Sequence, residues 1–162
     1  MVAVIRGHLY IEGLLSEMLH AMIPDFANMI DNEMGFAAKM QAALFSRHIP
    51  VDFMRPLVVI NNLRNSFAHK LDRTPLTMDD DNGLNGSLSS EMRSLYNVVT
   101  KGMDESAFVP GLKCIFGIVA VYSVLLTKVL TVVADRWREN NPNGTIEELT
   151  SVFKKFPTVH IN

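Results

Sequence analysis

The sequence predicts an all-α, single-domain helical bundle of about five to six helices. The chain has 162 residues, 48% hydrophobic and 20% charged, which is enough for one domain with a substantial core. Apolar residues recur at intervals of three and four residues, and the alternation typical of strands is absent. We therefore expect one helical domain over residues 1–156, followed by a C-terminal tail over 157–162.

Three helical stretches are expected in the first half. The first runs from about 3 to 22, where Pro24 follows its end. The second, 26–45, has a weaker apolar pattern, and Gly35 is a candidate break that would divide it into two pieces. Asp52 is the expected N-cap of the third helix, because Pro56 is tolerated only in an opening turn.

Residues 72–90 are expected to form an exposed loop, because the segment loses apolar periodicity and is rich in Pro, Gly, Asn, Asp and Ser. Its acidic run, 79–83, has no register that fits the ligand positions of an EF-hand, so a calcium loop is not predicted. A short helix over 91–100 follows.

A long, largely buried helix is predicted over 107–140, with Pro110 in its first turn and an apolar surface nearly all round between Ile115 and Val133. Its uncharged segment, 114–127, is shorter than the ~20 residues that span a bilayer, so a central core helix, not a membrane anchor, is expected. Thr145 and Glu148 fit a capping box for a final short helix.

Composition excludes several functional classes. A net charge of -2 and a pI near 6.2 argue against a broad DNA-binding surface. The five histidines have no close spacing and Cys114 is the single cysteine, so neither a metal site nor a disulfide is predicted. Phosphate-binding glycine loops and nucleophile elbows are also missing, so no cofactor is expected. No secretory signal is visible, which favours a cytoplasmic location.

The helix that ends near His69 has two contrasting faces. Pro56, Val59, Ile60, Leu63 and Phe67 share one side of the helical wheel, whereas a polar arc of about 100° contains Asn61, Asn62, Asn65 and His69. Arg64 and His69 flank part of this arc, about 140° apart. We take Arg64 and His69 as candidate catalytic residues, and Asn61, Asn62 and Asn65 as candidate substrate-binding or supporting residues.

An arginine offers a permanent charge and a forked donor array suited to phosphate, and a histidine titrates near neutrality, so the two together could cleave RNA without a metal. The competing interpretation is structural: Arg64 pairs with a carboxylate such as Glu12 or Asp72, and His69 caps the helix C-terminus. His8 and Glu12, one turn apart in the first helix, are likewise expected to form a structural pair in preference to a proton-transfer pair.

The segment Leu63-Arg64-Asn65-Ser66-Phe67-Ala68-His69 resembles the signature of the HEPN superfamily, in which an arginine and a polar residue are followed by three more residues and a histidine. Arg6-Gly7-His8, Phe36-Ala37-Ala38-Lys39 and the segment from Asn62 to His69 are also similar to bacterial proteins of the mannitol-operon-repressor-like group. Ala68 stands where one toxin branch of the superfamily has tyrosine, so assignment to that branch is not favoured.

This resemblance implies an all-α defence or regulatory module linked to nucleic acid. It implies a homodimer in which two Arg64 and His69 pairs form a composite, metal-independent endoribonuclease site, with His69 as general acid/base, Arg64 on the phosphate and Asn65 in support. An RNA substrate and an antitoxin or regulatory protein are the implied partners. The alternatives are a noncatalytic transcriptional regulator of the repressor-like type and a structural interaction protein.

Overall fold

The computed structural model describes residues 2–69, 76–102 and 111–154, with the side chains of Val2 and His69 excepted. This part of the chain is all-α and contains no strand, as predicted. The helices, in chain order, are α1 (Val2–Met22), α2 (Ala27–Asn32), α3 (Phe36–Phe45), α4 (Met54–His69), α5 (Met78–Ser87), α6 (Ser90–Thr100), α7 (Leu112–Asn140) and α8 (Ile146–Phe153). Two 3₁₀ helices, η1 (Pro24–Phe26) and η2 (Val51–Phe53), precede α2 and α4.

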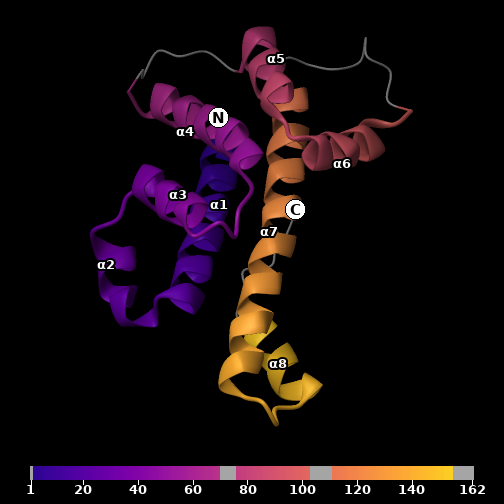
Figure 1. Cartoon of the computed structure of the whole chain (residues 1–162). Helices are drawn as coiled ribbons and strands as arrows, with labels where there is room; N and C mark the ends of the chain where they lie inside the picture. Colours follow the sequence, from indigo (N-terminus) through magenta and orange to yellow (C-terminus); the bar gives the residue numbers. More distant parts are fainter. Residues whose placement is uncertain (1, 70–75, 103–110, 155–162) are drawn as a thin grey trace.

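Helices α1 and α7 pack against each other at the centre of the bundle. Figure 1 shows α2, α3 and α4 gathered around α1, with α5 and α6 against one half of α7 and α8 at its other end. The close approach of α1 to α7 depends on Gly7, because a Cβ atom at this position would overlap the side chain of Ile118. The 29 residues of α7 make it the longest described helix, and it contacts most of the others.

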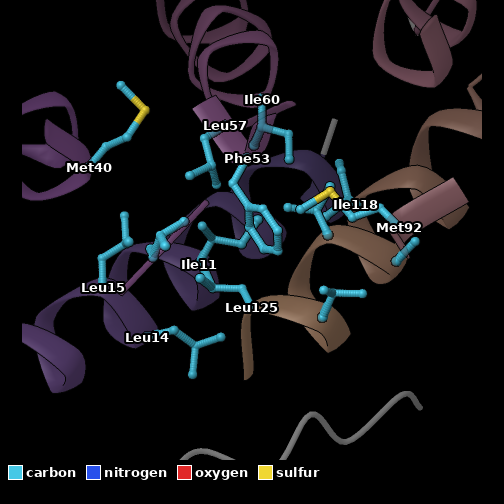
Figure 2. Close-up of a cluster of buried hydrophobic side chains, with 14 of the residues drawn as sticks. Ile11, Leu14, Leu15, Met40, Phe53, Leu57, Ile60, Met92, Ile118 and Leu125 are labelled. Carbon is cyan, nitrogen blue, oxygen red and sulfur yellow. The ribbon is translucent and has the colours of Figure 1, made fainter. Parts of the chain in front are cut away.

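One continuous hydrophobic core joins these helices. Figure 2 shows part of it, with Phe53 among side chains of α1, α4 and α7. The fully buried members include Ile11, Leu14, Leu15, Phe53, Leu57, Ile60, Met92 and Leu125. The apolar face predicted for the helix ending at His69 is confirmed in part, since Ile60, Leu63 and Phe67 are all buried.

The second predicted stretch is two helices. Gly35 is the N-cap of α3 and separates it from α2, which confirms the break expected there. The N-cap predicted at Asp52 is wrong, because Asp52 lies inside η2 and Pro50 is the N-cap of that turn. The short 3₁₀ turn brings Phe53 into the core, where its side chain is 1% exposed.

The exposed loop predicted over 72–90 is wrong for the described part of that range. Residues 78–87 form α5, which begins with a capping box in which Thr77 and Asp80 exchange hydrogen bonds. Asp81, Leu84, Leu88 and Ser89 are buried. Residues 72–75 of the predicted loop lie outside the described residues.

The long helix starts later than predicted. Gly111, the N-cap of α7, has a φ of 94°, a left-handed conformation that glycine adopts readily. This conformation is not that of a right-handed helix, so α7 begins at Leu112. Residues 107–110 lie outside the described part of the chain, as does the predicted tail, 157–162. The capping box of Thr145 and Glu148 is confirmed at the start of α8.

Helix α7 is long and apolar enough, by length and composition alone, to cross a membrane, and it is the only such helix in the described ranges. The core helix of a soluble protein meets the same criterion. In this fold α7 buries Cys114, Val121, Leu125 and Val129 against its neighbours.

Candidate functional site

The polar residues of α4 divide between the protein interior and solvent. Asn61, Arg64 and Asn65 are partly buried, whereas Asn62 is exposed. The Nη1 atom of Arg64 donates a hydrogen bond to Oδ1 of Asn65, with the two atoms 3.0 Å apart. Arg64 and Asn65 therefore form a contiguous polar pair, and Asn62 does not join it.

His69 is the last residue of α4, and its side chain lies outside the described part of the chain. Asp72, the second candidate partner of Arg64, also lies outside it. The predicted combination of the Arg64 and His69 side chains therefore stays a prediction. The backbone keeps both residues in the last six positions of one helix.

Asn61 is held by a residue of another helix. Its Oδ1 atom lies 3.2 Å from Nε2 of His8, which is 53 positions away in α1 and only 3% exposed. The His8 ring also stacks near the ring of Phe36 in α3, with the centroids 4.3 Å apart. Asn61 thus joins α4 to α1, and its part in substrate binding or support stays a prediction.

Two charged side chains complete this arrangement. Glu12 directs Oε2 toward Nδ1 of His8, at 3.8 Å, and Oε1 toward Nζ of Lys39, at 3.4 Å. The side chain of Lys39 is 8% exposed and that of Glu12 is 25% exposed. We call His8, Glu12, Lys39 and Asn61 the buried polar cluster; it links α1, α3 and α4.

The surroundings of His8 favour its neutral form. Burial lowers the pKa of His8 from its ordinary value of 6.5, and the nearby charge of Arg64 lowers it further. The hydrogen bond with Asn61 and the charge of Glu12 raise it, but burial is the largest effect. The net effect is a pKa of His8 below its ordinary value.

The structure overturns one of the two pairings expected for Arg64. Glu12 contacts Lys39 and His8, and no ion pair between Glu12 and Arg64 is formed. A guanidinium has five N–H donors, and the hydrogen bond to the neutral amide of Asn65 uses one of them. Arg64 thus has donors suited to an anion.

Sequence reasoning found the His8 and Glu12 pair but missed Lys39 and the contact from His8 to Asn61. Lys39 lies on the same face of α3 as the buried residues Phe36, Met40 and Ala43. A buried lysine on an apolar helix face needs a carboxylate partner. The position of Lys39 in the sequence could therefore have predicted its ion pair with an acidic residue. No group of three metal-ligating side chains occurs among the described residues.

Comparison with known proteins adds no relative: no protein-family model, curated protein or solved structure matches this chain. The resemblance to the HEPN superfamily therefore depends on the sequence motif alone.

Proposed function

We propose that the chain is a nucleic-acid-linked defence or regulatory module that cleaves RNA without a metal ion, as a homodimer. The observation that carries the proposal is the partly buried Arg64, whose guanidinium donates to the neutral amide of Asn65, while Glu12, a carboxylate expected to pair with it, contacts Lys39 instead. A fixed cation with spare donors is suited to an RNA phosphate.

In the proposed reaction the RNA 2'-oxygen attacks the adjacent phosphorus, and the bond from phosphorus to the 5'-oxygen breaks. His69 takes the proton of the 2'-hydroxyl, or, in its protonated form, delivers one to the departing 5'-oxygen. Arg64 stabilises the negative charge that develops on the phosphoryl oxygens. The products are a 2',3'-cyclic phosphate and a 5'-hydroxyl.

The test is cleavage of labelled single-stranded RNA by the purified protein in EDTA, with the products identified by mass spectrometry. Arg64→Ala and His69→Ala should each reduce the rate by about a hundredfold or more. Arg55→Ala, in the exposed opening turn of the same helix, and His48→Ala, also exposed, are the matched controls and should keep full activity.

Light scattering on the same samples should give about twice the 18.1 kDa chain mass for the wild type and all four variants. Cleavage that persists equally in Arg64→Ala marks a contaminating nuclease and contradicts the proposal. Binding of RNA without cleavage by the wild type would instead support the noncatalytic regulator.

A further inference from the structure

The buried polar cluster includes Asn61, which belongs to the polar arc of α4, and Arg64 lies beside this arc. Asn61 precedes Arg64 by three residues and Asn65 by four, so the three side chains lie on neighbouring positions of one helical surface. Only Asn61 of these three makes a hydrogen bond to another helix within the described chain. The His8 ring is therefore the contact through which α1 holds this end of the polar arc.

The geometry also fixes the proton on the ring. Oδ1 of Asn61 can only accept a hydrogen bond, so Nε2 of His8 carries the proton that it donates. Nδ1 is fully buried and has no hydrogen-bond partner, although Oε2 of Glu12 lies 3.8 Å from it. An additional proton on Nδ1 would turn this approach into a charged contact that competes with Lys39 for Glu12.

The charged groups around His8 come from three helices. Glu12 lies on its own helix, α1, Lys39 reaches Glu12 from α3, and Arg64 adds a positive charge from α4. A neutral His8 ring leaves Glu12 paired with Lys39 and adds no positive charge to that of Arg64. A protonated ring would compete with Lys39 for Glu12, and its positive charge would repel that of Arg64.

We propose that His8 is a positioning residue which, through its hydrogen bond to Asn61, holds the polar arc of α4 in the geometry that presents Arg64 to a phosphate. This inference rests on the proposed RNA-cleaving function for its kinetic consequence, but the placement of Arg64 can be measured without RNA. It assigns Asn61 to the support of the site and not to contact with the substrate.

The central experiment compares Asn61→Ala with Asn97→Ala, an asparagine exposed in α6. Both variants are first checked by circular dichroism. Asn61→Ala should lower kcat for RNA about ten- to hundredfold, the effect of a small displacement of a catalytic group, while Asn97→Ala should leave kcat and KM unchanged. Equal kinetics in the two variants would overturn the proposal.

Asn61→Asp separates positioning from simple loss of structure. The carboxylate keeps the acceptor for His8, so kcat near pH 8 should stay within about threefold of the wild type. It also raises the pKa of His8, since a carboxylate favours the protonated ring. The ring nitrogen shifts of His8, followed by NMR, should therefore titrate at higher pH in Asn61→Asp than in the wild type. A kcat reduced as far as in Asn61→Ala, or an unchanged titration of His8, would contradict the proposal.

Labelling of Arg64 by phenylglyoxal, quantified by mass spectrometry, tests the positioning without RNA. Arg64 should react at least about twofold faster in Asn61→Ala than in the wild type, because its guanidinium loses its fixed placement. Asn97→Ala should match the wild type.

The outcomes separate the two proposals. If the wild type cleaves no RNA but the variants show this labelling difference, the proposed function is rejected and the positioning role of His8 is supported. Cleavage by the wild type with equal labelling in all variants would reject the positioning alone. If Asn61→Ala fails to fold, kcat and the NMR titration of His8 in Asn61→Asp decide between the two outcomes.

Discussion

The carboxylate of Asp81 in α5 accepts a hydrogen bond from the backbone amide of Cys114 in the first turn of α7, with the two atoms 2.7 Å apart. Its other oxygen accepts from the amide of Gly111, at 2.8 Å. The first turn of a helix leaves amides without partners and carries a partial positive charge, so a carboxylate there is favourable. A side chain 30 or more positions away thus caps the longest helix of the bundle.

Removing this charge should destabilise the protein. Asp81→Asn should lower the free energy of unfolding by about 1.5–3 kcal/mol, because each of two buried amides loses a charged acceptor. Asp79→Asn, exposed in the first turn of the same helix, should cost less than about 1 kcal/mol. Urea denaturation of both variants measures the difference, and equal losses would show that Asp81 does not cap α7 in solution.

The two glycines of α1 should respond to alanine in opposite directions. A Cβ at Gly7 would overlap Ile118, so Gly7→Ala should cost about 1–3 kcal/mol through overpacking. Gly13 has no atom within 4 Å of its Cβ position, so Gly13→Ala should stabilise the helix by about 0.4–1 kcal/mol. Thermal denaturation should therefore place the two variants on opposite sides of the wild type. A loss of stability in Gly13→Ala would indicate that this face of α1 is covered.

The pair formed by Lys39 and Glu12 should show strong coupling. Lys39→Met and Glu12→Gln should each cost about 1–3 kcal/mol, because each leaves one poorly solvated charge without its partner. The double variant should lose less than the sum of the single losses, with a coupling of about 0.5–3 kcal/mol. Arg136→Ala, which breaks an exposed pair with Glu139, should cost at most about 1 kcal/mol. Additive losses at Lys39 and Glu12 would mean that their ion pair contributes nothing.

Local sequence patterns predicted most of the helices because the physics that forms them is local. The capping box of Thr145 and the break at Gly35 depend on neighbouring residues, and both are confirmed. Composition predicted a loop in place of α5, because an aspartate such as Asp81 is usually exposed to solvent. In the fold, the Asp81 carboxylate is buried and accepts hydrogen bonds from two backbone amides at the start of α7. This contact joins distant segments, so no local pattern contains it.

The same distinction applies to the candidate site. Periodicity placed Asn61 and Asn65 on the polar arc of α4 and Arg64 beside it, and the structure gives each of the three a partly buried position. The partner of Asn61 could not be predicted, because His8 is 53 positions away. Lys39 was missed because a single lysine in a weakly amphipathic helix is usually solvated, and its burial depends on the carboxylate of Glu12 from α1.

The buried His8 should make stability depend on pH in a defined direction. Its pKa in the folded protein is below the ordinary value of 6.5, chiefly because of burial. Between these two values the unfolded chain binds more protons than the folded one, so the free energy of unfolding falls as pH decreases from about 6.5 through the lower, folded pKa. Above pH 6.5 the stability gained from the neutral, buried His8 is fully present.

His8→Gln removes the titrating group and should flatten the pH dependence of the free energy of unfolding below pH 6.5, whereas His48→Ala, at an exposed position, should keep the wild-type slope. Urea denaturation at a series of pH values provides the measurement. A slope in His8→Gln equal to that of the wild type would show that His8 does not titrate differently in the folded and unfolded chains.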